Sequence, residues 1–197
     1  MKQEERRQQT MRLLMETTKE LVLEKGCPFV TMQDIMNRSG LSKGAIFHYV
    51  KSKDEIFVRL LDERLEETNA RFLHEIEQGR LTFEEPMQVI RESIVAYGEA
   101  HDATNKVLMY LLGKEDAPVV AAGLKRYYER SVALSRLWIE TGQRHGRIPE
   151  TIDAESTAEL FVLLTFGLRV RASIPDAKAV VSGHDLASFI ADKLHPR

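Results

Sequence analysis

Apolar residues recur every three or four positions along almost the whole chain, which is the spacing of one face of an α-helix. No stretch of the sequence shows the sustained alternation of apolar and polar residues that a half-buried β-strand needs. Proline and glycine interrupt the helical pattern at Pro118, Gly146, Pro149 and Pro175. The sequence therefore predicts an all-α protein of about nine helices.

The expected helices differ in length, and most are bounded by residues that favour helix ends. Gly26 stands where the first helix should have its C-terminal cap, and Pro28 blocks its continuation. The predicted helices cover residues 5–25, 32–38, a segment that begins at 43, 53–78, 83–100, 104–113, 117–145, 153–173 and 183–194.

The bulk properties indicate a soluble protein. A chain of 197 residues can bury a hydrophobic core without disulfide bonds, and its single cysteine, Cys27, excludes an internal disulfide. We interpret Cys27 as a small buried residue in preference to a redox site. Residues 1–9 lack the apolar stretch of a signal peptide, and the apolar run 160–168 is far shorter than the roughly 20 residues of a membrane span. We expect a cytoplasmic protein that makes no membrane contact.

Charge is unevenly distributed along the chain. The formal net charge is -2, which argues against coating of nucleic acid through bulk charge. Residues 1–53, however, hold ten Lys and Arg against six Asp and Glu, while the remainder holds eighteen against twenty-four. This distribution predicts that only the N-terminal part binds a polyanion.

Three polar residues predict helix N-termini in this N-terminal part. Thr31, Ser42 and Ser52 each precede an apolar helical pattern, and each can accept a hydrogen bond from a free N–H of the first turn. Ser52 and Glu55 have the spacing of a capping box. Only a few residues, including Gly40, separate the second predicted helix from the third. Two short helices joined in this way match a helix-turn-helix unit, whose second helix can enter a DNA major groove.

The residues of this unit separate into inward and outward positions. The inward positions are Ile35, Met36, Leu41, Ile46 and Val50. The outward positions are Ser42, Lys43, Gly44, Ala45, His48 and Tyr49. N-terminal amides and a lysine suit a phosphate, a small alanine can contact a thymine methyl, and glycine permits close backbone approach.

This segment resembles the TetR (tetracycline-repressor) family of bacterial regulators. Thr31, Ile35, Gly40, Ser42, Lys43, Gly44, Tyr49 and Lys53 stand at positions of the family signature, and Leu41, Ala45, Ile46 and Phe57 are close relatives of its residues. The sequence departs from the signature at Phe47, where the family usually has tyrosine, and at Val50, where it often has phenylalanine. Phe47 cannot donate a hydroxyl bond to phosphate, so affinity should fall by about 1 kcal/mol unless Tyr49 supplies that bond.

The resemblance implies a set of DNA contacts. It gives Thr31, Tyr49 and Lys53 as phosphate contacts, and it favours Gln33, Lys43, Ala45 and His48 as base readers. The predicted DNA-binding residues are Thr31, Gln33, Ser42, Lys43, Gly44, Ala45, Phe47, His48, Tyr49 and Lys53. A structural alternative stays open for several of them, because Thr31 and Ser42 would cap their helices without DNA and Tyr49 could cover the start of the next helix.

The remainder of the chain is expected to dimerise. We predict a DNA-binding domain over residues 1–53, a connecting helix over 53–78, and an effector-binding and dimerisation domain over 79–197. Residues 160–168 are apolar around the whole helical circumference, which predicts cover on both sides, either by a second subunit or by burial within one subunit. The resemblance implies a four-helix dimer interface. Its predicted residues are Phe161, Leu164, Gly167, Leu168, Leu186, Phe189 and Ile190.

An effector cavity in this part is also implied by the resemblance. Met and aromatic residues at helical spacing are its candidate lining, although such a stripe more often belongs to an ordinary core. Arg169 and Arg171 are candidates for binding an acidic group, although a structural role at a helix C-terminus is equally open. The predicted effector-binding residues are Met87, Tyr97, Met109, Tyr110, Tyr127, Tyr128, Trp138, Phe166 and Arg169.

Enzyme chemistry is not expected. The six histidines form no His-x-x-x-His pair, and the sequence contains neither a phosphate-binding Gly-rich loop nor a nucleophile elbow. We predict no catalytic residue, no metal site and no cofactor. The resemblance implies a homodimeric repressor that binds a palindromic double-stranded DNA operator and leaves it when a small-molecule effector binds. The alternative is a helical protein-interaction or adaptor module without DNA-binding activity.

Overall fold

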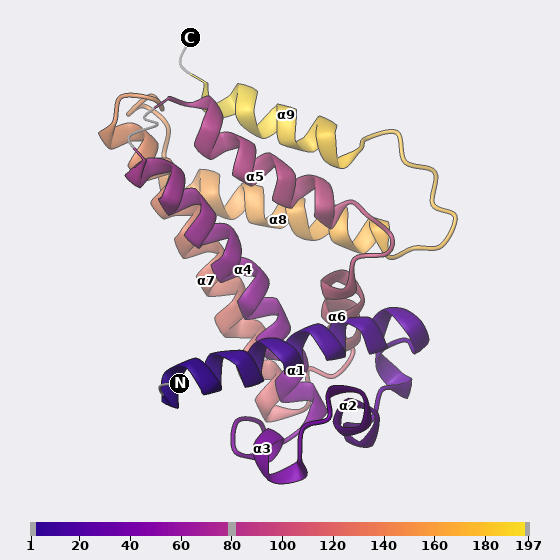
Figure 1. Cartoon of the computed structure of the whole chain (residues 1–197). Coiled ribbons are helices and arrows are strands. Elements are labelled where there is room, and N and C mark those ends of the chain that lie inside the picture. The colour runs from indigo at the N-terminus through magenta and orange to yellow at the C-terminus, as the bar shows by residue number, and fades with distance from the viewer. Residues whose placement is uncertain (1–2, 79–81, 196–197) are drawn as a thin grey trace. The chain divides into compact units, whose positions relative to one another are not determined.

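The computed structural model describes residues 3–78 and 82–195, and over these ranges it contains nine α-helices, one short 3₁₀ helix and no β-strand (Figure 1). The predicted all-α fold is confirmed, and the helix ends lie at most three residues from the predicted ones. The elements are α1 (Gln3–Lys25), η1 (Cys27–Phe29), α2 (Met32–Ser39), α3 (Lys43–Phe47), α4 (Lys53–Glu77), α5 (Glu84–Tyr97), α6 (Ala103–Leu112), α7 (Pro118–Arg144), α8 (Ala154–Ala172) and α9 (Gly183–Leu194).

The chain forms two compact units, each built from two separate stretches of sequence. The first unit contains residues up to 63 together with 101–125, and the second contains 64–100 together with the residues from 126 onward. Two helices, α4 and α7, therefore begin in the first unit and end in the second. The predicted domain division at residues 53 and 79 stays a prediction.

The first unit is built on α1, which packs against α2 and α6. The buried face of α1 consists of Leu14, Met15, Thr17, Thr18, Leu21 and Val22. Its exposed positions are mainly charged and polar, with Leu13 and Leu23 as apolar exceptions. The core of this unit combines that face with side chains from α2, α3, α4, α6 and α7. Its buried residues include Leu14, Met15, Val22, Ile35, Ile46, Ile56, Phe57, Leu60, Val107, Leu108, Leu111 and Val120.

The connection from α1 to α2 contains an element that the sequence reading missed. Gly26 has a φ of 80°, a conformation that favours glycine, and the next three residues form the 3₁₀ helix η1. Cys27 opens this turn with only 3% of its surface exposed, and burial raises the pKa of its thiol to about 11. The interpretation of Cys27 as a small buried residue is confirmed, since a buried neutral thiol is chemically inert.

Thr31, Ser42 and Ser52 cap their helices as predicted, but the full capping box is found at Thr31 and not at Ser52. The complete capping box belongs to Thr31, whose Oγ1 accepts from the Asp34 N–H while Asp34 accepts from the Thr31 N–H. At α4 the Glu55 N–H donates to Ser52 Oγ at 3.2 Å, but the Glu55 carboxylate accepts from the N–H of Lys51. The capping box that we predicted for Ser52 and Glu55 is therefore incomplete, because the N–H that donates to Glu55 is that of Lys51 and not that of Ser52.

Asp34 also forms an ion pair with Lys25. Its carboxylate lies 2.8 Å from Lys25 Nζ, and these bonds from Lys25 and Thr31 lower its pKa to about 2. The start of α2 is thus held both by its own capping box and by a charged contact with the end of α1.

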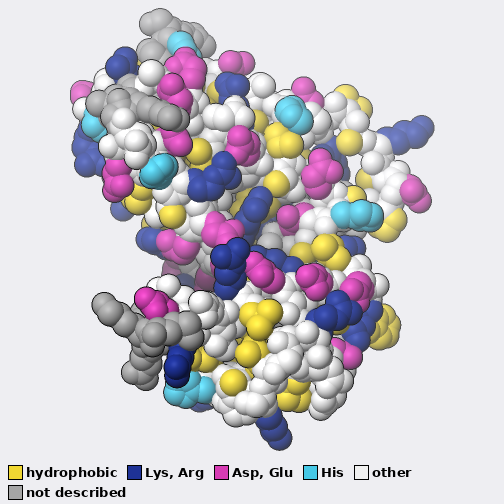
Figure 2. Space-filling view, in the orientation of Figure 1, with side chains coloured by type: hydrophobic (Ala, Val, Ile, Leu, Met, Phe, Trp, Pro, Cys, Tyr) yellow, Lys and Arg dark blue, Asp and Glu magenta, His cyan; other side chains and the backbone are white. Residues whose placement is uncertain are grey.

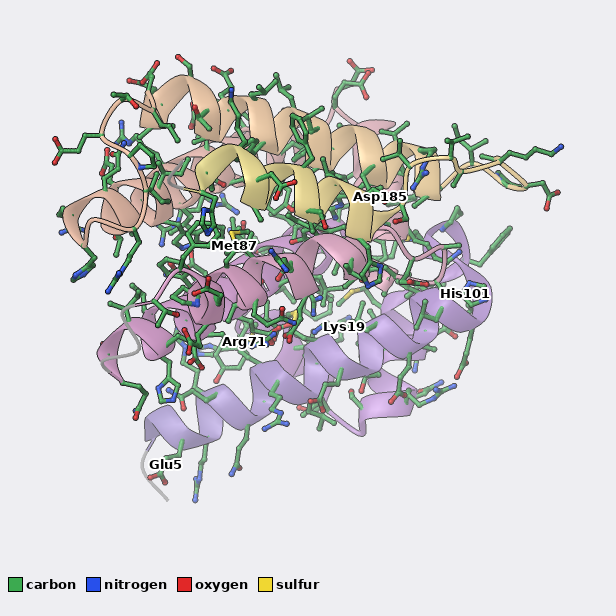
Figure 3. The ribbon with its side chains drawn as sticks, turned by 90° about the horizontal axis from the view of Figure 1, so that it is seen from above. Glu5, Lys19, Arg71, Met87, His101 and Asp185 are labelled. Carbon is green, nitrogen blue, oxygen red and sulfur yellow. The ribbon has the colours of Figure 1, made fainter. Side chains whose placement is uncertain are left out.

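In the second unit α5 packs against both α8 and α9 (Figure 1). The capping box of Ser182 and Asp185 begins α9, and Figure 3 shows Asp185 at this end of the helix. The first residue of α9 is Gly183, and a Cβ added there would lie 2.9 Å from the Cα of Val95 in α5. Any larger residue would collide with backbone, so Gly183 sets the close approach of α9 to α5.

Helix α8 has one apolar face inside the second unit and another on its surface. Phe161, Val162 and Leu168 are buried, whereas Leu160, Leu163 and Val170 are 43–53% exposed. No helix in the described part of the chain is both long and apolar enough to cross a membrane.

Candidate nucleic-acid interface and ligand pocket

The turn between α2 and α3 holds the two helices in a fixed arrangement. Gly40 ends α2 with a φ of 68°, and its N–H donates to the carbonyl of Met36 at 3.0 Å. Two residues later, Ser42 caps α3 by accepting the N–H of Ala45 at 3.2 Å. Ile35 and Ile46 are fully buried and attach the two helices to the core of the first unit. The chain thus forms the predicted helix-turn-helix unit.

The outward face of α3 carries cations and an aromatic ring. Lys43, Phe47 and His48 are exposed, and Lys43 Nζ lies 5.7 Å from the centre of the Phe47 ring. Figure 2 shows dark-blue Lys or Arg and cyan His side chains on the lower part of the face in view, and Lys43 is the basic residue of α3 itself. A surface that is basic, aromatic and close to a helix N-terminus suits contact with phosphates and base edges.

No neighbouring atom and no backbone strain within the chain explains why residue 44 is glycine. A Cβ added at Gly44 would meet no atom within 4 Å, and its φ is not in the left-handed region. Glycine inside a helix costs roughly 0.5–1 kcal/mol relative to alanine, so neither packing nor backbone geometry in the free chain requires it. The bare backbone at Gly44 is therefore suited to close approach by a molecule outside the chain.

Two of the predicted DNA-binding residues, Thr31 and Gln33, lie at the exposed start of α2. Thr31 is engaged in its capping box, and its Oγ1 also donates to Asp34 Oδ2 at 2.6 Å. Gln33 is exposed and its amide donates to Asn37 Oδ1 at 2.7 Å. Both side chains are accessible, but Thr31 already has the structural role that the sequence left open.

Tyr49 and Lys53 are less accessible than Lys43 and Phe47 of α3. Tyr49 is half-buried, stacks edge-on against His48 at 4.8 Å, and its carbonyl accepts a bond from Arg59. Lys53 Nζ donates to the carbonyls of Cys27 and Pro28 at 3.0 and 3.4 Å and lies 5.3 Å from the centre of the Tyr110 ring. In this structure Lys53 fastens the start of α4 to η1.

A pocket opens in the second unit between α4, α5, α7, α8 and α9. Its volume is about 140 Å³ and its walls are mainly apolar. An apolar cavity of about this size, roughly 150 Å³, is known to take a molecule such as benzene. Six predicted residues line it, and Figure 3 marks one of them, Met87 of α5. The six are Met87, Tyr97, Tyr127, Trp138, Phe166 and Arg169.

The other three predicted effector residues do not line this pocket. Met109 and Tyr110 lie on α6 in the first unit, where the ring of Tyr110 packs edge-on against Phe57 at 5.4 Å. Tyr128 is on α7, but its hydroxyl donates to Glu159 at 3.1 Å and it is not part of the pocket wall. Their assignment to an effector site is not supported by the position of the pocket.

Arg169 is the unusual member of the pocket wall. Only 1% of its surface is exposed, and Nη1 donates to the hydroxyl of Tyr127 at 2.5 Å. Its guanidinium lies 4.5 Å from the centre of the Tyr97 ring and 5.9 Å from that of Phe166. A buried arginine stacked on aromatic rings is held in one orientation, with its planar fork of donors fixed in space.

The sequence reading also missed polar members of the wall. Ser131 and Ser135 line the pocket from α7, together with Thr68 of α4 and Ser93 of α5. Ser131 and Ser135 follow Tyr127 at successive intervals of four residues, so they share one helical face with it. That spacing was the signal that would have found them.

The predicted dimer residues fall into two groups in the second unit. Phe161, Leu168, Leu186 and Ile190 are buried within the chain. Leu164, Gly167 and Phe189 are exposed, and Phe189 exposes 52% of its surface. Leu160, Leu163 and Val170, which we did not predict, extend the exposed group along α8. A side chain added at Gly167 would meet nothing within 4 Å, which leaves room for close approach.

An all-helical chain with a helix-turn-helix unit, a basic outward helix and a separate apolar pocket has the features of a DNA-binding regulator. Residues 14–60 match the family described as bacterial regulatory proteins, tetR family. Residues 14–60 therefore form a helix-turn-helix domain of this family, and the chain is similar to transcriptional regulators of the tetR type. The predicted resemblance is confirmed.

Similar proteins are found both by sequence and by structure. The HTH-type transcriptional repressor BepR of Brucella suis is 24% identical over 170 residues, which cover 81% of this chain and 78% of BepR. A TetR-family regulator from Rhodococcus sp. has a TM-score of 0.70 at 14% identity, covering 95% and 98% of the two chains. A regulator from Saccharomonospora viridis, solved with choline, has a TM-score of 0.66 at 20% identity, covering 94% and 95%.

Proposed function

We propose that this protein is a homodimeric repressor, which binds a palindromic DNA operator through α3 and leaves it when a small molecule fills the pocket of the second unit. The observation that carries the DNA-binding part is the outward face of α3, where exposed Lys43 and His48 flank the open backbone of Gly44. Nothing within the chain requires glycine at that position, whereas close approach to DNA does.

The proposed DNA contacts divide into two kinds. Lys43, Ala45, His48 and Gln33 are placed to reach base edges, because they are at least partly exposed on α3 or at the start of α2. Thr31, Ser42, Gly44, Phe47 and Tyr49 would contact the sugar-phosphate backbone and fix the register. Lys53 can join them only by giving up its bonds to the carbonyls of Cys27 and Pro28.

The dimer is proposed from the exposed apolar residues of α8 and α9. Leu160, Leu163, Leu164 and Phe189 are each at least 36% exposed, and the two helices pack against each other. Pairing this surface with its copy would bury these side chains in a four-helix interface. Two recognition helices would then address two half-sites about one helical turn apart, roughly 34 Å.

Release from DNA is proposed to follow from linkage. If the ligand binds more tightly to the dimer whose recognition helices are wrongly spaced, it must weaken operator binding by the same factor. Both α4 and α7 run from the first unit into the second and contribute residues to the pocket wall, so either helix can couple the two units. The regulator would act where it meets DNA, in the cytoplasm.

The test begins with selection of bound sequences from a random DNA pool by the purified protein. We expect a palindromic winner whose affinity falls steeply with salt, with a log-log slope of about -0.9 for each phosphate neutralised. The absence of any enriched sequence would overturn the proposal and favour a helical protein-interaction module.

Lys43→Ala is the first variant to test on the selected operator. We expect operator affinity or sequence preference to be lost while helicity and the oligomeric state are unchanged, because the Lys43 side chain is exposed. Fluorescence anisotropy measures the affinity, and Lys106→Ala, an exposed lysine on α6, is the matched control. Equal affinity of the Lys43 variant and the wild type would remove Lys43 from the interface.

A further inference from the structure

Most hydroxyl groups in the interior of the pocket wall are already hydrogen-bonded within the chain. Thr68 and Ser93 bond each other at 2.9 Å, and Ser131 donates to the carbonyl of Tyr127 at 2.8 Å. The hydroxyl of Thr165 donates at 2.8 Å to a carbonyl one turn earlier in α8. A hydroxyl that is bonded in this way gains little from a second partner, so these groups act as part of an apolar wall.

The charged groups of the wall are also engaged within the chain. Arg169 is buried, and its Nη1 donates to the hydroxyl of Tyr127 at 2.5 Å. Both Arg169 and Arg147 make further interactions inside the molecule, and His145 is exposed to solvent. A charged guest would lose its hydration on entering the pocket, and burial of a charge that gains no new partner is costly. The wall therefore favours an uncharged guest.

Aromatic rings form much of the remaining wall. The ring centres of Phe72 and Trp138 lie 5.5 Å apart, and those of Tyr127 and Phe166 lie 6.0 Å apart. Aromatic rings attract one another in offset or edge-to-face arrangements at such separations, so a further ring between them would be stabilised. The cavity volume of about 140 Å³ suits one ring of roughly the size of benzene.

Ser135 differs from the other wall hydroxyls. It is half-buried, and among the buried and half-buried wall hydroxyls of the described chain it is the one without a hydrogen-bond partner inside the molecule. A guest that covers Ser135 removes this hydroxyl from water, which costs free energy unless the guest supplies a bond in return. A guest with one hydroxyl or carbonyl group meets that need.

We propose that the effector is a compact, uncharged aromatic compound with one hydrogen-bonding group, and that the hydroxyl of Ser135 bonds this group. The inference rests on the proposed function, because it assigns a ligand class to the pocket of that regulator. Burial of the ring among apolar side chains supplies most of the affinity. Ser135 selects among rings by the polar group that they carry.

The test compares five probes that share a benzene ring, on the whole chain at pH 7. Phenol and benzyl alcohol carry a neutral hydroxyl, toluene carries none, benzylamine is a cation and benzoate is an anion. Trp138 is the single tryptophan of the chain and lines the pocket, so its fluorescence reports binding without a label, and calorimetry provides an independent measure. We expect phenol or benzyl alcohol to bind at least tenfold more tightly than benzylamine and benzoate.

A variant then locates the hydrogen bond. Ser135→Ala should weaken phenol and benzyl alcohol about three- to tenfold and should not weaken toluene, because only the hydroxyl compounds lose a bond. Ser188→Ala, at an exposed serine of α9 outside the pocket wall, should change none of the affinities. The comparison of charged and neutral probes on the wild type stands without any variant.

The outcomes separate this inference from the proposed function. Equal or tighter binding of benzylamine or benzoate, or no binding of either hydroxyl compound, overturns the neutral ligand class even if another compound releases DNA. An equal effect of Ser135→Ala on toluene and on the hydroxyl compounds overturns the role of Ser135. Binding that depends on Ser135 but leaves operator affinity unchanged supports the ligand class and contradicts release by that ligand.

Discussion

At the scale of single residues, the glycine at position 44 is explained by the proposed DNA contact and not by the fold. An added side chain would find open space in the free protein, so the fold gains nothing from glycine at this position.

Replacing Gly44 with leucine should therefore change stability and DNA binding in opposite directions. We expect the free energy of unfolding of Gly44→Leu to rise by up to about 1 kcal/mol, because leucine is the better helix former. Operator affinity should fall at least tenfold, because the side chain occupies the space that DNA needs. Urea denaturation and anisotropy measure the two quantities.

One result would contradict the prediction for Gly44→Leu. A variant that binds the operator as well as the wild type would show that DNA does not approach the backbone there. Glu115→Leu, at an exposed position in the same unit, tests whether a new surface leucine by itself alters DNA binding.

At the scale of elements, helix ends were predictable because they depend on local chemistry. Thr31, Ser42 and Ser52 all accept first-turn N–H groups, as their position in the sequence indicates. The 3₁₀ turn that begins at Cys27 was missed, because three residues are too few for a periodic signal.

Tertiary placement was harder to predict than helix position. Six of the nine predicted effector residues line the pocket, but α6 packs in the first unit and takes Met109 and Tyr110 with it. Periodicity shows that a residue faces a core, yet it does not show which core. For the same reason, burial of Phe161 and Leu168 within the chain could not be separated from burial in a dimer.

The contact between α5 and α9 gives a prediction at this scale. Gly183→Ala should lower the free energy of unfolding by about 1–3 kcal/mol, because its Cβ would lie 2.9 Å from the Cα of Val95 and helices must shift to relieve the overlap. Denaturant unfolding measures the loss. Ser188→Ala, an exposed position on the same helix, should change stability little. Equal losses in both variants would contradict the role of Gly183.

At the scale of the whole molecule, the exposed apolar residues of α8 require explanation. Leu160, Leu163 and Val170 have the spacing of one face of α8, and Phe189 is exposed on α9, which packs against α8. In the proposed dimer, a second copy of the chain would cover this surface.

A charge introduced on this surface should dissociate the dimer. We expect Leu163→Glu to be monomeric in analytical ultracentrifugation and to bind the operator at least tenfold more weakly, because burying an unpaired carboxylate is costly. Val119→Glu makes the same change at an apolar residue of α7 that is 56% exposed, and it should remain dimeric. A dimer that persists in Leu163→Glu would place the interface elsewhere.

The walls of the pocket come from the second unit alone, while the outward face of α3 belongs to the first. Mutations that reshape the cavity can therefore accumulate without altering the DNA sequence that α3 recognises. Mutations in α3 can likewise change that sequence without altering the cavity. In evolution, such a protein can acquire a new chemical trigger while it continues to control the same genes. Relatives that share this recognition helix should accordingly answer to different compounds, and exchange of pocket residues offers a route to biosensors with a common operator.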